Sequence, residues 1–261
     1  MGDLLKKLYD SQVWKSLWRH GMPKDPRNRS MAVLTNVFLH LHPVRTRVGA
    51  LKVRFTWCMG GLTFFIFLTL VFNGVLLMFY YHPNARDAYP DIEKLESGDV
   101  PFGMLMRNMH RWGAHLMVIS VWLHMFRVFL TGSYKPPREF NWVVGVALLF
   151  FTLLLSFTGY LLPWDQLAFW AITVGTNMAR ATPLLGHEGP GAQYLNIGGE
   201  FPLITSRSDV RFALLAGRIV GAGALLRFYV LHCILLPLVA ATFMGIHFWR
   251  IRKDGNISGP V

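Results

Sequence analysis

Charged residues are scarce in this sequence, and their scarcity excludes an ordinary soluble domain. They make up 15% of the 261 residues, against 53% hydrophobic and 14% aromatic residues, whereas a typical soluble domain has about 25% charged residues. Cysteine is scarcer still: Cys58 and Cys233 lie in separate apolar runs, which excludes a disulfide framework. Residues 1–54 contain no apolar core of the length that a cleavable leader needs, so we expect Met1 to be retained.

Long apolar runs decide the class of protein. An apolar segment of about 20 residues is long enough to cross a membrane as a helix, and these runs do not alternate as the strands of a membrane barrel do. The predicted fold class is therefore an all-α membrane protein, a four-transmembrane-helix bundle. The predicted spans are residues 56–81, 110–130, 142–162 and 228–249.

We expect two parts along the chain. Residues 1–54 form a basic N-terminal segment, in which residues 31–44 make an amphipathic helix on the membrane surface. Residues 55–261 form the membrane domain. Its longest loop, residues 163–227, begins with an apolar stretch suited to an interfacial helix.

Basic residues lie where membrane topology would place them. The formal net charge is +12, and residues 1–54 hold eleven of the Lys and Arg residues. Because basic segments stay on the cytoplasmic or stromal side, both termini are predicted to lie on that negative side. The acidic loop at 82–109 then lies on the positive side. This distribution accounts for the charge without nucleic acid, which we exclude as a partner.

Four histidines inside the predicted spans are paired by their spacing. His110 and His124 are 14 residues apart, and His232 and His247 are 15 apart. At about 100° per residue, 14 steps return to within about 40° of the start and 15 steps overshoot by about 60°. Each pair therefore lies near one face of its helix, with a rise of about 21–22.5 Å between its members. Since the two spans run in the same direction, His110 is predicted to meet His232, and His124 to meet His247.

These imidazole pairs are suited to the iron of b-type haem, which takes its axial ligands from the protein. An ionisable residue inside a membrane helix is a functional candidate, although any single one is equally well explained as a neutral histidine bonded to a neighbouring helix. His115 lies about 140° around the helix from His110 and is left out. The prediction is two b haems, with the four paired histidines as metal ligands.

Glycines in the other two spans repeat the 14-residue spacing. Gly60 and Gly74 lie in the first span, and Gly145 and Gly159 lie in the third. Glycine lets other groups approach the backbone closely, so we expect these four to make room for flat macrocycles. Glycine is also common at contacts between membrane helices, but a shared period in all four spans favours the haem interpretation.

Haem propionates are anionic and need cations near them. Five arginines near the ends of the spans are candidates, and each is equally well explained as an ordinary interface anchor. They are Arg107, Arg111, Arg127, Arg138 and Arg252.

Six stretches carry a resemblance to a known family. They are WCMGGLTFF at 57–65, RNMHRWGAHL at 107–116, LHMFRVFLTGSYKPPREFNWVVGV at 123–146, FTGYLLPWDQ at 157–166, LRFYVLHCILLP at 226–237 and HFWRIRKDGNISGP at 247–260. The chain resembles cytochrome b6, the short form of cytochrome b in quinol-oxidising complexes, and its firmicute menaquinol-reductase relatives. The resemblance covers most of residues 55–180 and 218–261.

The resemblance implies a path for electrons. It assigns His110 and His232 to a low-potential haem near the positive side, and His124 and His247 to a high-potential haem near the negative side. Electrons from quinol would pass through these haems to a quinone site near the negative side, while protons leave on the positive side. The implied quinol-oxidising site includes Phe157, Tyr160, Pro163, Trp164, Asp165 and Phe169.

Cys58 has a separate role in the resemblance. In the family, the cysteine of a YCxGG-like motif carries a haem c through a single thioether bond, and here the motif is WCMGG at 57–61. No CxxCH haem-attachment motif is present, and a cysteine in a span is most often a small buried apolar residue. We expect covalent attachment at Cys58 and simple packing at Cys233.

The resemblance also implies partners. Full-length cytochrome b continues into further helices with a Pro-Glu-Trp-Tyr motif, which this sequence lacks. We therefore expect a subunit-IV-like chain that carries the motif, a Rieske iron–sulfur protein, a c-type cytochrome and a homodimeric complex. The chain alone would then be inactive as a quinol:cytochrome c (or plastocyanin) oxidoreductase. An insertion at 186–217 and a long basic N-terminal segment depart from the family pattern.

Two other classes of function stay open. A dihaem membrane anchor of another respiratory oxidoreductase would also need paired histidines, but it would not need the PWDQ segment, the paired glycines or the closing ISGP. A haem-free transporter or channel would not explain the shared 14-residue period.

Overall fold

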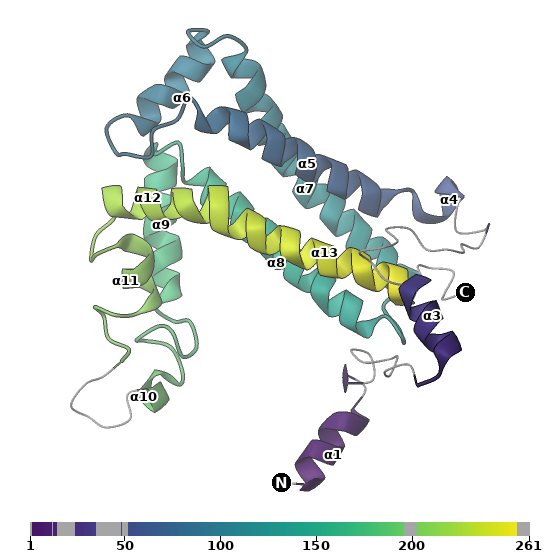
Figure 1. Ribbon diagram of the computed structural model, residues 1–261. Helices are drawn as coiled ribbons and strands as arrows, with labels where there is room; N and C mark the ends of the chain where they lie inside the picture. Colours follow the sequence, from purple (N-terminus) through teal and green to yellow (C-terminus); the bar gives the residue numbers. More distant parts are fainter. Residues whose placement is uncertain are drawn as a thin grey trace. The chain divides into compact units, whose positions relative to one another are not determined.

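The computed structural model describes residues 2–11, 13–14, 24–34, 48, 52–195 and 203–254. Every regular element in these residues is a helix, and no strand occurs among them (Figure 1). The elements are α1 (Gly2–Asp10), α3 (Pro26–Leu34), α4 (Val53–Thr56), α5 (Met59–Met78), α6 (Ala88–Ser97), α7 (Gly103–Leu130), α8 (Glu139–Tyr160), α9 (Gln166–Ala179), α10 (Ala192–Leu195), α11 (Val210–Leu215), α12 (Ala222–Val230), the π-helix η2 (Leu231–Leu235) and α13 (Leu236–Asp254).

Within the described part of the chain, four helical stretches are long and apolar enough to cross a membrane, and they confirm the predicted fold class. They are Met59–Met78, Gly103–Leu130, Glu139–Tyr160 and Ala222–Asp254, the last of which joins α12, η2 and α13. Three begin earlier than the sequence predicts, at Gly103 rather than residue 110, at Glu139 rather than residue 142 and at Ala222 rather than residue 228. The first begins later, at Met59 rather than residue 56. An apolar run marks only the part of a helix that meets lipid, whereas the backbone hydrogen bonds continue into the polar flank.

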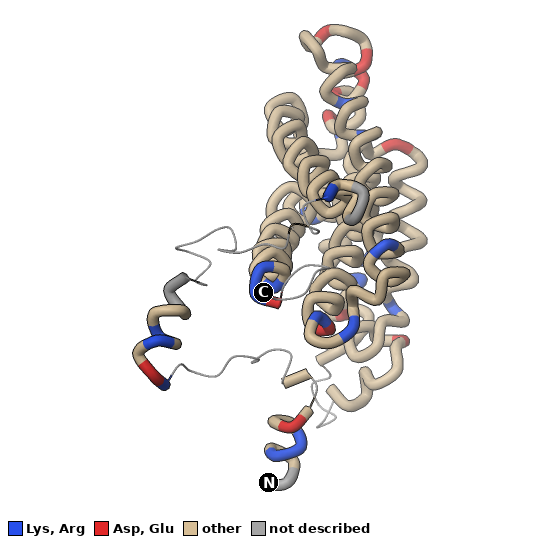
Figure 2. The backbone as a smooth tube through the Cα atoms, turned by 90° about the vertical axis from the view of Figure 1, so that its right-hand side faces the viewer, with Lys and Arg blue, Asp and Glu red and all other residues tan. Residues whose placement is uncertain are grey.

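Large apolar side chains cover the outer surfaces of these helices. Phe72 is 68% exposed, Phe65 and Trp112 are each 66% exposed, and Leu130 is 78% exposed. Figure 2 shows that the long helices are free of charge over most of their length and carry Lys, Arg, Asp and Glu mainly toward their ends. So much exposed apolar surface is unusual in a soluble monomer, and it fits helices surrounded by lipid.

The chain divides into two compact units. Unit 1 comprises Met1–Ile66, Leu116–Thr152 and Val239–Val261, and unit 2 comprises Phe67–His115 and Leu153–Leu238. The boundaries fall within the long helices. Each unit therefore contains one section of each of the four candidate spans.

The core of unit 2 lies where α8, α9, α11 and α12 come together. Helix α9 is capped by Asp165, the residue before it, whose carboxylate accepts a hydrogen bond of 2.7 Å from the backbone N–H of Ala168. This is a common way to satisfy the first turn of a helix. The hydroxyl of Tyr81 donates to the carbonyl of Leu162 over 2.6 Å. The buried residues of the main cluster are Leu161, Ile172, Leu215, Ala224 and Phe228.

Two buried carboxylates stabilise the outer part of unit 2. Asp91 accepts hydrogen bonds from the backbone N–H and the ring Nδ1 of His82, at 2.9 and 2.7 Å. Burial alone would raise the pKa of Asp91, but its hydrogen bonds from His82 and Lys94 lower the pKa below the ordinary value. Asp209 likewise caps α11 and bonds to His187 over 2.5 Å. This last bond joins two points of the predicted insertion at 186–217, of which residues 196–202 lie outside the described residues.

Aromatic contacts connect the helix sections of unit 1. The ring centroids of Phe64 and Phe248 are 5.1 Å apart, which joins α5 to α13. Arg250 is fully buried, forms an ion pair of 2.9 Å with Asp254 and lies 5.0 Å above the ring centre of Phe140. These contacts hold α8 and α13 together at the end of unit 1 that carries the C-terminal residues of α13.

The described residues of the N-terminal segment include the short helices α1 and α3. In α1, Lys6 and Lys7 stand between the exposed leucines Leu5 and Leu8. The sequence predicts a surface helix at 31–44, and α3 covers residues 31–34 of it. Residues 35–44 lie outside the described residues, so this element stays a prediction.

Candidate functional site

Among the described residues, each unit contains one pair of facing histidines. In unit 2, the ring centroids of His110 on α7 and His232 on η2 are 6.1 Å apart, with the ring planes at 77°. In unit 1, the centroids of His124 on α7 and His247 on α13 are 6.4 Å apart, with the planes at 82°. The structure therefore brings together the same two pairs that the helical spacing predicts.

The separation of the rings fits one metal ion between each pair. A metal–imidazole bond is about 2.0–2.1 Å long, so two imidazoles on opposite sides of one metal have centroids about 6.3 Å apart. Among the described residues, no group of three or more His, Cys, Asp or Glu side chains could hold a metal. The four ring nitrogens of a haem would supply the remaining ligands of a metal held by either pair.

All four predicted glycines lie against the paired histidines. A Cβ atom added to Gly159 would lie 2.6 Å from Cε1 of His232, and one added to Gly74 would lie 3.2 Å from Cε1 of His110. In unit 1, a Cβ on Gly60 would lie 3.3 Å from His124, and one on Gly145 would lie 3.8 Å from His247. The sequence predicts that these glycines make room for flat macrocycles, and in the structure their nearest side chain is the imidazole of a paired histidine. They let each ring stand against a helix backbone, and an added Cβ would meet the ring most closely at Gly159 and only at ordinary contact distance at Gly145.

The π-helix explains why the two histidine spacings differ. His232 lies in η2, and the spacing from His232 to His247 is 15 residues, compared with 14 between His110 and His124. A π turn holds one residue more than an α turn, and such turns inside α-helices are frequent at functional sites. In a regular helix, 15 residues would overshoot the starting face by about 60°. The π turn takes up the extra residue, so that His232 and His247 can still face the same side of the helix.

The second ring nitrogen, Nδ1, does not have the same environment in all four histidines. Nδ1 of His232 lies 3.1 Å from the hydroxyl oxygen of Thr158. Nδ1 of His110, His124 and His247 is buried and has no side-chain partner. One of the four paired rings therefore has a side-chain partner.

Cys58 lies between α4 and α5 in unit 1 with an exposed side chain. Both Trp57 and Cys58 adopt left-handed backbone conformations, with φ of 52° and 50°. This unusual turn ends α4 and places the thiol two residues before Gly60, which contacts His124. Cys233 is half-buried next to His232 in η2.

The predicted arginines occupy several different environments. Arg107 forms an ion pair with Glu96, and Arg111 is exposed on the same helix. The Nε of Arg138 is buried and lacks a hydrogen bond. Arg127 and Arg252 are partly exposed near the ends of α7 and α13. His115, which the sequence argument leaves out, is exposed and bonds to the carbonyl of Arg111 over 2.8 Å.

The residues of the implied quinol site all lie in unit 2, but they do different things there. Phe157 and Trp164 pack against the buried cluster, and Asp165 uses its carboxylate to cap α9. Tyr160 is 54% exposed and Phe169 is 37% exposed, and the Phe169 ring lies 6.4 Å from that of Trp164. Pro163 is half-buried in the turn before α9. The exposed members are the ones that are accessible to a partner or a substrate.

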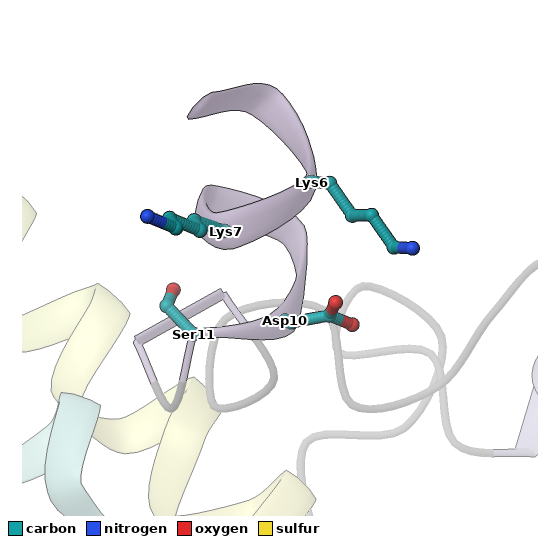
Figure 3. A pocket seen from close by; sticks show the side chains of 4 residues that line it. All are labelled: Lys6, Lys7, Asp10 and Ser11. Atoms are coloured by element: carbon teal, nitrogen blue, oxygen red, sulfur yellow. The ribbon is translucent and has the colours of Figure 1, made fainter. Parts of the chain in front are cut away.

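Two residues are not among those that the sequence predicts. Arg250 is a fully buried cation of unit 1, whereas the sequence predicts Arg252. Thr158 bonds to His232, and its place directly before Gly159 is a clue that spacing alone did not use. A surface pocket at α1 is lined by Lys6, Lys7, Asp10 and Ser11. Lys6 and Lys7 point to opposite sides there (Figure 3), so their side chains do not converge on one site as the paired histidines do.

Comparison with known proteins gives a consistent family. The family described as cytochrome b/b6/petB matches residues 44–189. The menaquinol:cytochrome c reductase cytochrome b subunit of Bacillus subtilis (strain 168) is 37% identical over 268 aligned residues, which cover 99% of this chain and 100% of that protein. Cytochrome b6 of Gracilaria tenuistipitata var. liui is 41% identical over 209 residues, which cover 80% of this chain and 86% of that protein.

A solved structure agrees with these relatives. A chain of a hyperthermophilic respiratory Complex III superposes with a TM-score of 0.63 and is 30% identical. The match covers 77% of this chain and 48% of the other, so the present chain spans about half the length of that relative.

Proposed function

Since the chain belongs to the cytochrome b/b6 family, as the cytochrome b subunit of a quinol:cytochrome c reductase or b6f-type complex, we propose that each of its histidine pairs holds one b-type haem. His110 and His232 bind the haem of unit 2, and His124 and His247 bind the haem of unit 1. The supporting observation is the separation of the paired rings, 6.1 and 6.4 Å, which suits one metal between two imidazoles. Haem held in this way supplies one-electron transfer.

The chain's own part is to position and insulate the two groups. The four glycines let the imidazoles stand against neighbouring helices, and the apolar spans keep water away from the sites. Following the family pattern, the His110–His232 haem is the low-potential one near the positive side. The His124–His247 haem is the high-potential one near the negative side, where quinone binds. The arginines at 107, 111, 127, 138 and 252 are the candidate partners of the propionates.

Cys58 is the proposed attachment site of a haem c. The Cys58 thiol would add across one vinyl group of a haem held there, so that its sulfur would bond to one vinyl carbon and its hydrogen to the other. The reaction needs no oxidant. The exposed side chain of Cys58, in a turn two residues from Gly60, supports this assignment.

Quinol oxidation is proposed at the unit 2 end of α8. Tyr160 and Phe169 offer exposed aromatic surface there, while Phe157, Pro163, Trp164 and Asp165 hold the turn and the start of α9 in place. The remaining parts come from partners: a Rieske iron–sulfur protein, a chain with the Pro-Glu-Trp-Tyr motif and a c-type cytochrome, in a homodimeric complex.

The proposed topology places both termini on the negative side of the membrane, with residues 1–54 as a separate basic segment and residues 55–261 as the membrane domain. The basic residues of the N-terminal segment and of the end of α13 support this orientation. Cysteine labelling from each side of sealed vesicles, at single cysteines placed in the 82–109 loop and in α1, would test it.

Purification in mild detergent tests the function as a whole. We expect the chain to co-purify with an iron–sulfur protein and to reduce cytochrome c when quinol is added. Isolation with a soluble dehydrogenase, and no iron–sulfur partner, would instead identify a dihaem anchor.

A further inference from the structure

Thr158 is a buried residue of α8 that lies directly beside His232. It is 3% exposed. Its hydroxyl donates to the carbonyl of Leu154 over 2.9 Å, which leaves the oxygen lone pairs as acceptors. Nδ1 of His232 lies 3.1 Å from that oxygen. An imidazole protonated on Nδ1 would donate to this oxygen, and its Nε2 would keep the lone pair for a metal.

The other three paired histidines have no such partner. Backbone carbonyls face three of the rings, from Leu70 toward His110, from Leu155 toward His232 and from Asn141 toward His247. This backbone influence is shared between the two units. His232 differs from the other three in having the Thr158 hydroxyl as well, since Nδ1 of His110, His124 and His247 has no side-chain partner.

We propose that Thr158 is a positioning residue that fixes the His232 ring and lowers the reduction potential of the haem held by His110 and His232. This inference rests on the proposed haem ligation. An acceptor on Nδ1–H gives the imidazole partial anionic character and makes Nε2 a stronger donor. A stronger donor stabilises the oxidised iron more than the reduced iron, and hydrogen bonding outside the metal ligands is one of the means by which proteins tune haem potentials. The hydroxyl thus gives a reason, in this chain, for one haem to have the lower potential.

Redox titration of the two b haems in the purified complex tests the proposal. Thr158→Val removes the hydroxyl and keeps the side-chain shape, whereas Thr158→Ser keeps the hydroxyl. Thr176→Val is the matched control, because Thr176 is also buried, and its hydroxyl donates to the carbonyl four residues earlier over 2.8 Å. The His110→Ala variant identifies which titration wave belongs to the unit 2 haem.

The expected result is an upward shift of that wave alone in Thr158→Val. A tenfold change in the relative affinity for oxidised and reduced iron corresponds to about 59 mV for one electron. Thr158→Ser should restore the original potential, and Thr176→Val should change neither wave. If Thr158→Val fails to assemble, Thr158→Ala removes the same hydroxyl by deletion only.

Three outcomes would overturn the inference while haem ligation stands: both waves unchanged in a variant that keeps its haems, an equal shift of both waves, or an equal shift in Thr176→Val. A wild-type complex without two b-haem waves would instead contradict the proposed function, so the two failures are distinguishable.

Discussion

The two histidine sites are built from the same residue types but differ in how closely they are packed. In unit 2, a Cβ on Gly159 would lie 2.6 Å from the His232 ring, whereas in unit 1 a Cβ on Gly145 would lie 3.8 Å from the His247 ring. Unit 2 also has the π turn and the Thr158 hydroxyl at its site. Two histidines and two glycines thus form each site, and the packing of the surrounding helices determines how large a side chain each glycine position can accept.

Loss of a histidine should have the largest effect and should be confined to one unit. We predict that His110→Ala removes the unit 2 haem, and that His124→Ala removes the unit 1 haem, because each iron loses one of its two axial ligands. Pyridine haemochrome analysis should show b haem falling by about half in either variant. A variant that keeps both b-haem signals would break the assignment.

Loss of Cys58 should remove the covalently attached haem c and leave the b haems of both units in place. In Cys58→Ala, the polypeptide should no longer stain for haem after denaturing electrophoresis, since no thioether remains. Both b haems should still be present in the optical spectrum. Cys233→Ala is the matched control and should keep its haem stain. Absence of the stain in the wild-type chain would refute covalent attachment.

Alanine at the glycines should separate the two units most clearly. Gly159→Ala forces a methyl group into the His232 ring, and such overpacking costs about 1–3 kcal/mol. We expect reduced haem occupancy in unit 2. Gly145→Ala makes only an ordinary contact, so the unit 1 haem should remain. Equal haem loss in the two variants, measured optically, would show that the difference in packing has no consequence.

The smallest expected effect lies at Asp91, outside both haem sites. Because the folded-state pKa of Asp91 is lowered, its stabilising contribution is fully present above the unfolded pKa of about 3.9 and is lost as the pH falls through the folded value. Asp91→Asn at neutral pH should weaken the 82–97 region by about 1–2 kcal/mol.

Hydrogen exchange of the His82 amide is the direct measurement for this change, since that N–H donates to Asp91. Exchange should be faster in Asp91→Asn, while amides in unit 1 stay unchanged. Unchanged exchange at His82 would show that the hydrogen bond contributes little.

Sequence periodicity predicts the four candidate spans and which histidines face one another, but it does not predict the local geometry of the two sites. Apolar length identifies a span, and 14- or 15-residue spacing identifies a face, because both follow from regular helix geometry. The π turn at Leu231–Leu235 departs from that regularity, and no residue type in it marks the departure. The contact between Thr158 and His232 joins residues 74 positions apart. It depends on the packing of α8 against η2, which spacing within one helix does not contain.

The glycines also have a feature that sequence periodicity does not predict. Their 14-residue repeat is visible in the sequence, yet the group they admit is visible only in the fold. The four added Cβ atoms would lie at 2.6, 3.2, 3.3 and 3.8 Å from imidazole carbons. Nothing in the glycine spacing predicts that these distances differ.

Electron paramagnetic resonance of the oxidised wild-type complex, combined with a haem count per chain, tests the central claim most directly. The account predicts two b haems per chain, both low-spin with two imidazole ligands. A single b haem, or an axial ligand other than His110, His124, His232 and His247, would contradict it.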